Sequence, residues 1–236
     1  MSSTILCIET STEICSVVLA KGGEVVDRLE DANGMNHSRL LTQFIDELLN
    51  RNDLKAADLA AVAVSEGPGS YTGLRIGVSA AKGICFAVNK PLIAISPLHS
   101  MADAVIRNQK ELNLKLEVTD LLVPMIDARR MEVYRAIYSS KGELLENTDA
   151  VIVDETTFSA LLELGRVLFF GNGAEKLKPV IQHPNALFID GIVTSASHMA
   201  SIANLMFENE QFVDVAYFEP FYLKDFIAIK STKKMF

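Results

Sequence analysis

The sequence of 236 residues predicts an α/β protein of two lobes, each with a mixed β-sheet and helices. Three observations lead to this prediction. Three strand-like segments open the chain, and helices and strands alternate after them. A glycine-rich bend joins one of these strands to a helix. A shorter version of the same order then returns in the second half of the chain.

The first half begins with strands joined by tight turns, which predict an antiparallel meander. The helix after the meander has apolar residues at every third or fourth position. In chain order, the predicted elements are strands at 4–9, 14–20 and 24–30, a helix at 37–50, a strand at 59–65, a helix at 74–88, a strand at 91–96 and a helix at 97–108.

The second half repeats this order in a shorter form. Its predicted elements are strands at 121–126, 132–138 and 144–153, a helix at 156–164, a strand at 166–170, a helix that begins at 171–173 and a helix at 195–208. A meander followed by alternating helices and strands is typical of a ribonuclease-H-like or actin-like lobe. We therefore expect a first lobe at 1–108 and a smaller second lobe at 109–236, whose C-terminal segment could return to the first lobe.

The composition excludes several classes of protein. Hydrophobic residues make up 49% and charged residues 22% of the chain, which indicates a globular protein. The three cysteines, Cys7, Cys15 and Cys85, lie in apolar runs and fit buried thiols in a reducing compartment. The net charge of −8 argues against a protein that binds RNA or DNA unaided, because phosphate neutralisation supplies most of that affinity.

Nothing in the sequence predicts a membrane segment. The apolar stretch 74–88 is too short to span a bilayer and contains Arg75 and Lys82. Met1-Ser-Ser-Thr4 leads into a strand-like run without a basic region, so we expect no secretory signal and a cytoplasmic location.

The glycine-rich bend at 66–77 is the first candidate site. Gly67, Gly69 and Gly73 stand between a strand and a helix, an arrangement that can present backbone N–H groups to a phosphate. The bend lacks the lysine of a Walker A loop, and its spacing differs from the dinucleotide-binding fingerprint. Phosphate contact and a plain tight turn both remain open.

Two further turns could face a nucleotide between the lobes, and a third could orient a ligand or a partner's acid. Glu9, Thr10 and Ser11 place an acid and two hydroxyls in the first turn, and Glu9 is the nearest candidate to help position a metal ion. Hydroxyls that satisfy a β-turn are an equal alternative. Gly171 and Gly173 fit a nucleotide-side turn or an ordinary bend. The stretch 127–132, with an acid and two arginines, fits a ligand contact or a surface turn.

The sequence predicts no metal site and no catalytic residue. The four histidines are scattered, and His37 is followed at the helical i+4 spacing by Leu41 instead of a second histidine. No spacing pairs a nucleophile with a base.

Small residues recur along the helix predicted at 74–88. Gly73, Gly77 and Ala81 lie four apart, and Ala80, Gly83 and Ala87 add further small positions. Such a stripe lets another backbone approach closely. It could pack on the protein's own sheet or contact a helix of another chain.

Several segments together resemble one family. They are Ile8–Ser11, Asn36–Leu41, Gly67–Gly77, Asp127–Tyr134 and Pro220–Lys224. In this order they resemble the TsaB (YeaZ) family of bacterial tRNA threonylcarbamoyladenosine biosynthesis proteins, paralogues of TsaD within the actin-like ATPase superfamily. The resemblance spans nearly the whole chain, and its ending departs from the usual one only by Lys224 in place of arginine.

The resemblance implies a two-lobed actin-like fold and a role in making N6-threonylcarbamoyladenosine at position 37 of tRNA. It implies a non-catalytic subunit that binds and activates TsaD and helps to recruit the ATPase TsaE, and that forms a homodimer when TsaD is absent. TsaD holds its metal with a His-x-x-x-His pair, which His37 and Leu41 do not provide. The resemblance implies no required cofactor, optional ATP or ADP binding, and contact with tRNA only through the complex.

In this family the helices of the first lobe mediate pairing. Carried over, the interface candidates are Met35, His37, Leu40, Leu41, Phe44, Leu48, Gly73, Ile76, Gly77 and Ala80. The alternative is an autonomous actin-like ATPase or nucleotide-binding enzyme, which the hydroxyl turn and the glycine turns keep open. The metalloprotease suggested by an older family label would need a metal site that the sequence does not supply.

Overall fold

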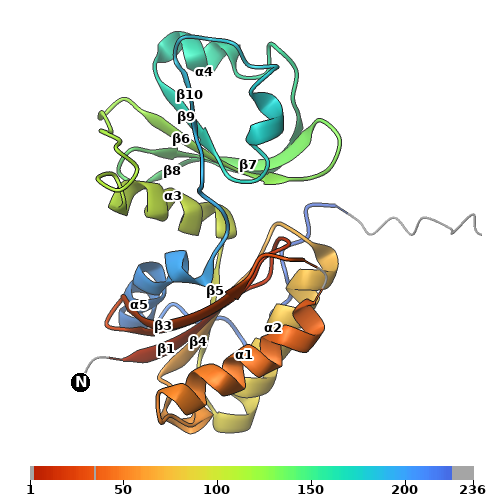
Figure 1. The fold of residues 1–236 in the computed structure, drawn as a ribbon, viewed down its shortest axis with the longest axis vertical. Coiled ribbons are helices and arrows are strands. Elements are labelled where there is room, and N and C mark those ends of the chain that lie inside the picture. The colour runs from red at the N-terminus through yellow and green to blue at the C-terminus, as the bar shows by residue number, and fades with distance from the viewer. Residues whose placement is uncertain (1–2, 35, 225–236) are drawn as a thin grey trace, which may run out of the picture.

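The computed structural model describes residues 3–34 and 36–224 as two lobes, each built around a five-stranded sheet (Figure 1). In the first sheet the strand order is β3-β2-β1-β4-β5. The strands are β1 (Thr4–Glu9), β2 (Cys15–Lys21), β3 (Glu24–Asp31), β4 (Ala61–Ser65) and β5 (Leu92–Ile95). β1, β2 and β3 pair antiparallel, whereas β4 pairs parallel to β1 and β5 pairs parallel to β4. The predicted meander is confirmed.

The second sheet repeats this arrangement, with the order β10-β9-β6-β7-β8. Its strands are β6 (Leu121–Asp127), β7 (Glu132–Ser139), β8 (Leu144–Ile152), β9 (Val167–Phe170) and β10 (Ala186–Ile189). β6, β7 and β8 form the antiparallel meander, and β9 and β10 are parallel to β6. The sequence analysis missed β10. The repeated order confirms the actin-like, ribonuclease-H-like fold.

Two long helices cover one face of the first sheet. α1 (His37–Arg51) and α2 (Tyr71–Val88) lie side by side in Figure 1, and the short η1 (Ala56–Asp58) follows α1. Their apolar faces share one core with β1, β2 and β4. α2 begins three residues earlier than predicted because Ser70 caps it, with the Ser70 hydroxyl oxygen accepting a hydrogen bond from the Gly73 N–H at 3.2 Å.

Two of the predicted helices pack against the sheet of the other lobe, not against the sheet that their place in the sequence suggests. α3 (Pro97–Arg107), predicted as the end of the first lobe, packs Leu98 and Met101 against the second sheet. η3 (Ala196–Met199) and α5 (Ala200–Glu208), predicted in the second lobe, pack on the face of the first sheet opposite α1 and α2. An amphipathic pattern identifies the apolar face of a helix but not the sheet that it covers.

The remaining helices of the second lobe are short. α4 (Ser159–Leu164) and η2 (Glu175–Leu177) cover the other face of the second sheet. The helix predicted to begin at Gly171–Gly173 is therefore only the single turn of η2. No helix among the described residues has the length and apolar character needed to cross a membrane.

The chain returns to the first lobe after α5. Residues 213–224, here called the C-terminal strap, begin where Val213 pairs with Leu92 of β5. The Lys82 ammonium then donates hydrogen bonds to the Ala216 and Phe218 carbonyl oxygens, at 3.1 and 2.8 Å. At its end the strap reaches the second lobe, where Lys224 forms an ion pair with Glu132. The strap therefore connects the two lobes.

Candidate functional site

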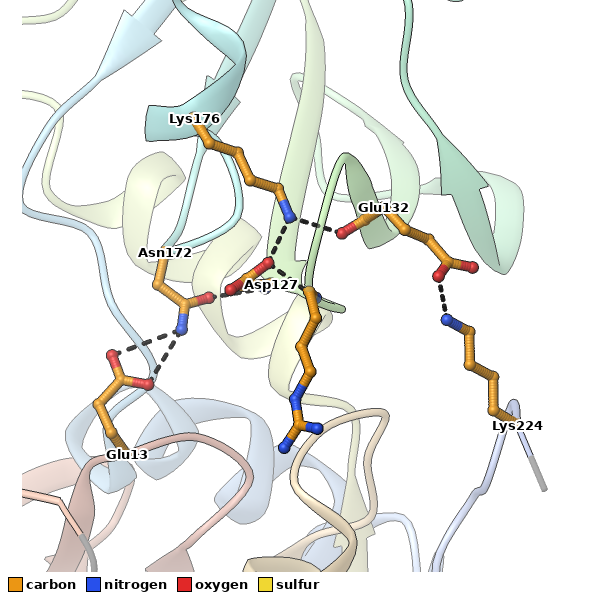
Figure 2. A network of polar contacts seen from close by, with 7 residues as sticks. Glu13, Asp127, Glu132, Asn172, Lys176 and Lys224 are labelled. Carbon is orange, nitrogen blue, oxygen red and sulfur yellow. Dashed lines mark hydrogen bonds and ion pairs between the residues drawn. The ribbon is translucent and has the colours of Figure 1, made fainter. Parts of the chain in front are cut away.

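The candidate site lies where loops from the carboxyl ends of the central strands meet between the two lobes. In open α/β sheets, ligands bind in the crevice at this edge. The first lobe contributes the turn at 10–14, which follows β1, and the bend at 66–70, which follows β4. The second lobe contributes the turn at 128–131 after β6 and the turn at 171–173 after β9 (Figure 2).

The two loops of the first lobe pack tightly against each other. A Cβ atom at Gly69 would collide with the Ser11 carbonyl oxygen, and one at Gly73 would collide with the Thr10 carbonyl oxygen. Hydrogen bonds join the same residues: the Ser70 N–H donates to the Ser11 carbonyl oxygen at 2.6 Å, and the Thr10 hydroxyl donates to the Gly73 carbonyl oxygen at 2.9 Å. The backbone and hydroxyl groups of each loop therefore form hydrogen bonds with the other loop.

Glu9 is fully buried beneath this contact. Its Oε1 accepts a hydrogen bond from the Ser11 N–H at 2.6 Å, whereas Glu9 Oε2 and the Ser11 hydroxyl are buried without a partner. Burial raises the pKa of the Glu9 carboxyl, and the contacts with Ser11 oppose this shift. Glu9 is thus a buried acid that holds its proton to a higher pH than an exposed glutamate does.

The turns of the second lobe are packed in a similar way. A Cβ atom at Gly171 would collide with the Met125 carbonyl oxygen, and one at Gly173 would lie too close to the backbone of Ile126 and Asp127. Gly171 also has a φ of +98°, a conformation that favours glycine. Both glycines therefore allow the turn to approach the end of β6.

Asn172 connects the two lobes at this point. Its Oδ1 accepts a hydrogen bond from the Asp127 N–H at 3.0 Å, and its Nδ2 donates to the Glu13 carboxylate of the first lobe at 3.1 Å (Figure 2). Lys176 in turn binds Asp127 and donates to the Glu132 carbonyl oxygen at 2.7 Å. The sequence analysis missed Asn172, Glu13 and Lys176, whose only signal was their place in or beside the turns.

A pocket of about 270 Å³ opens beside this contact. Its lining includes Glu13, Gly171, Asn172, Lys178, Asp190 and Gly191. Lys178 and Asp190 form an ion pair at 2.6 Å in this lining, which also contains apolar side chains such as Phe169 and Phe188. Of the residues predicted to face a nucleotide, only Gly171 lines this pocket. The structure places the others as follows: Glu9, Thr10, Ser11 and Gly69 in the loop contact of the first lobe, Gly67 against Leu74 and Phe221, and Gly173 against the end of β6.

The structure corrects part of the predicted partner interface. Leu41, Leu48, Gly73 and Gly77 are buried inside the first lobe, and the space beside Gly77 is filled by the Thr10 side chain. His37 is also buried, and its Nε2 donates to the Ile14 carbonyl oxygen at 3.2 Å.

Gly73 and Gly77 of the inward stripe thus pack closely on the protein's own turn, and Ala81 lies in the apolar core beneath α2. Among the other predicted interface residues, Leu40, Phe44, Ile76 and Ala80 are partly buried at the rim of the core. Met35 lies outside the described residues. Within residues 3–34 and 36–224, no group of three or more histidine, cysteine, aspartate or glutamate side chains is arranged to hold a metal ion.

Gly73→Ala tests the loop contact. We expect this substitution to destabilise the protein by about 1–3 kcal/mol in urea unfolding, because the new methyl group meets the Thr10 carbonyl oxygen. Gly83→Ala in the same helix is the matched control. Gly83 has open space around it, so alanine should stabilise the helix by about 0.5–1 kcal/mol. Equal stability of the two variants would contradict the contact.

Glu9→Gln tests the buried acid. Because the pKa of Glu9 is raised by folding, the unfolded chain releases this proton first, near the ordinary value of 4.5. The free energy of unfolding of the wild type should therefore fall, relative to the variant, as the pH rises above about 4.5, by about 1.4 kcal/mol per unit of pKa shift. Denaturation experiments on the wild type and the variant from pH 4 to 8 measure this difference in the free energy of unfolding. Glu155→Gln, at an exposed carboxylate, should leave the profile unchanged.

Comparison with known proteins agrees with this architecture. The family model of TsaD, tRNA N6-adenosine threonylcarbamoyltransferase, matches residues 31–230. The tRNA threonylcarbamoyladenosine biosynthesis protein TsaB of Escherichia coli is 32% identical, with 96% of both chains covered, and that of Bacillus subtilis is 32% identical, with 94% of both covered. The solved structure of YeaZ from Pseudomonas aeruginosa is 26% identical, with a TM-score of 0.77 over 94% of this chain and 100% of that chain. The chain therefore belongs to the TsaB (YeaZ) family, whose fold it shares across both lobes.

Proposed function

We propose that this chain is a non-catalytic subunit of the machinery that installs N6-threonylcarbamoyl on adenosine 37 of tRNA. In this role it binds and activates the transferase TsaD and helps to recruit the ATPase TsaE. The observation that carries the proposal is similarity over nearly the full chain to relatives named for threonylcarbamoyladenosine biosynthesis. A match to the family model of the transferase itself supports descent from a common ancestor.

The outer side of α1 and α2 suits a partner helix. We define the α1–α2 face by six residues: Leu40, Phe44, Ile76, Ser79, Ala80 and Gly83. Ser79 and Gly83 are exposed, and a Cβ atom added to Gly83 would meet no other atom within 4 Å. Small residues beside partly buried apolar ones allow a second helix to approach closely. This outward set replaces the inward glycines as the candidate contact.

The environment of His37 supports a non-catalytic role. The metal-binding pair of the transferase would need a second ligand at position 41, which is a buried leucine. The His37 ring instead donates to the Ile14 carbonyl oxygen and fixes the start of α1 against the end of the turn at 10–14. Its present contacts are those of a structural histidine.

The same face suits self-association when TsaD is absent. A two-fold dimer uses one patch on both copies, and a patch of small and apolar residues is self-complementary. We further propose a cytoplasmic setting, no required cofactor, and contact with tRNA only within the complex.

One observation favours a second candidate function, an autonomous nucleotide-binding enzyme or ATPase. The pocket beside Glu13 and Asn172 lies in the crevice between the lobes, where this architecture offers a place for ATP or ADP. The tight packing of the turn at 10–14 on the bend at 66–70 counts against it, because the Ser70 N–H and the Thr10 hydroxyl already donate within this contact.

Gly83→Trp tests the pairing proposal. A large side chain on the α1–α2 face should hold a partner helix away, so we expect at least a tenfold loss of affinity for the host's TsaD, measured by titration calorimetry. Size-exclusion chromatography with light scattering should show the complex replaced by free chains, while the melting temperature stays close to that of the wild type. Asn147→Leu, exposed on β8, is the control. Normal pairing of Gly83→Trp would remove this face as the interface.

ATP turnover separates the two candidate functions. We expect the purified chain alone to release no phosphate from ATP above the level of a buffer control, and to stimulate threonylcarbamoyl transfer when mixed with TsaD. If the isolated chain hydrolyses ATP, and both Glu9→Gln and Asn172→Ala abolish this activity, the chain is an ATPase and the non-catalytic role is wrong.

A further inference from the structure

The turn between β6 and β7 presents two consecutive arginines. Arg129 and Arg130 are exposed, with φ values of 70° and 53°. Left-handed backbone costs about 1 kcal/mol or more at each residue other than glycine, so the surroundings must enforce it. Here the Arg129 N–H donates to the Asp127 carboxylate at 2.9 Å, and the Glu132 N–H donates to the Arg129 carbonyl oxygen at 3.2 Å. The turn therefore holds both arginines at its tip.

The acids that flank these arginines already have cations of their own. Asp127 forms an ion pair with Lys176, and Glu132 forms one with Lys224 (Figure 2). Among the described residues, no carboxylate forms an ion pair with Arg129 or Arg130, although the chain carries a net charge of −8. Two guanidinium groups are thus left available to an anion from outside the chain.

Aromatic rings continue this cationic surface across both lobes. Tyr222 of the strap lies against Tyr71 of α2, with ring centroids 4.8 Å apart, and Arg75 lies over the Tyr71 ring at 5.1 Å. Two residues further along the strap, Lys224 lies over Tyr134 of β7 at 5.7 Å. Because Lys224 also pairs with Glu132, this row of rings ends beside the arginine turn.

We define the tyrosine–arginine patch by these seven residues: Tyr71, Arg75, Arg129, Arg130, Tyr134, Tyr222 and Lys224. Besides Asp127 and Glu132, two further acids lie nearby. Glu219 is one of the charged groups that influence the pKa of the Tyr222 hydroxyl. Glu66 is largely buried, and this burial raises the pKa of its carboxyl. Neither forms an ion pair with the cations of the patch.

We propose that the tyrosine–arginine patch binds a single-stranded stretch of RNA, which, resting on the proposed function, belongs to the tRNA being modified. Guanidinium groups grip phosphates, and tyrosine rings offer faces on which unpaired bases stack. A negatively charged chain binds RNA weakly by itself, so the patch adds affinity within the assembled complex. This chain then contributes to substrate binding as well as to assembly.

The test measures RNA binding by the complex of this chain with its host's TsaD. A fluorescent transcript of a tRNA that reads codons beginning with A is titrated with the wild type, Arg129→Ala/Arg130→Ala and Tyr222→Ala. We expect Kd to rise about tenfold for the double variant, and the slope of log Kd against log salt to fall by about 1.4, the value for two lost phosphate contacts. Tyr222→Ala should raise Kd about fivefold or more through lost stacking.

Lys110→Ala/Lys141→Ala is the matched control. Both lysines are exposed, and they lie towards the opposite end of β7, where Gly142 faces Ile106 of α3. This control variant removes the same amount of positive charge as the double arginine variant, and it should leave Kd and the salt slope near those of the wild type. An intact complex whose RNA affinity is unchanged in the patch variants would overturn the proposal. Patch variants that lose TsaD would also overturn it, in favour of an acidic protein surface as the occupant.

A second measurement keeps the inference separate from the proposed function. If the wild-type chain fails to pair with TsaD, the pairing proposal fails, and the RNA contact is judged on the full chain alone. Ultraviolet cross-linking to the same transcript at low salt, followed by mass spectrometry of the peptides, should find adducts on Tyr222 or Tyr134. Cross-links elsewhere, or none, would overturn the inference.

Discussion

The close packing of the turn at 10–14 on the bend at 66–70 is the constraint on which the first lobe depends. Gly69 and Gly73 bring the bend and the start of α2 against the backbone of Thr10 and Ser11, and no side chain fits between them. This contact fixes α2 on the sheet and leaves Glu9 buried beneath it. Because the Ser70 N–H and the Thr10 hydroxyl donate across this contact, the bend positions the start of α2 on the sheet.

The position of α2 decides which surfaces the protein offers. With Gly73 and Gly77 turned inward, Ser79 and Gly83 are exposed on the outer side of α2. The opposite flank of α2 receives the C-terminal strap, which Lys82 holds through two carbonyl oxygens. One helix therefore separates a small, apolar face suited to a partner from a row of tyrosines and cations that leads to the second lobe.

Polar contacts join the lobes on either side of the crevice. Asn172 reaches Glu13 on one side, and the strap brings Lys224 to Glu132 on the other. The acids beside the arginine turn are paired with lysines, Glu132 with Lys224 and Asp127 with Lys176, and Arg129 and Arg130 have no ion-pair partner among the described residues. These contacts hold the surfaces on which the proposed assembly and RNA binding depend.

The sequence by itself determined the order of the elements, the two meanders and the fold class, because strand alternation, helical spacing and glycine turns are local signals. It missed β10, a short strand whose hydrogen bonds depend entirely on β9. Only the tertiary structure decided that α3 covers the second sheet and α5 the first, and that Gly73 and Gly77 face Thr10 rather than a partner. Periodicity defines which side of a helix is buried, but what it is buried against depends on residues far away in the chain.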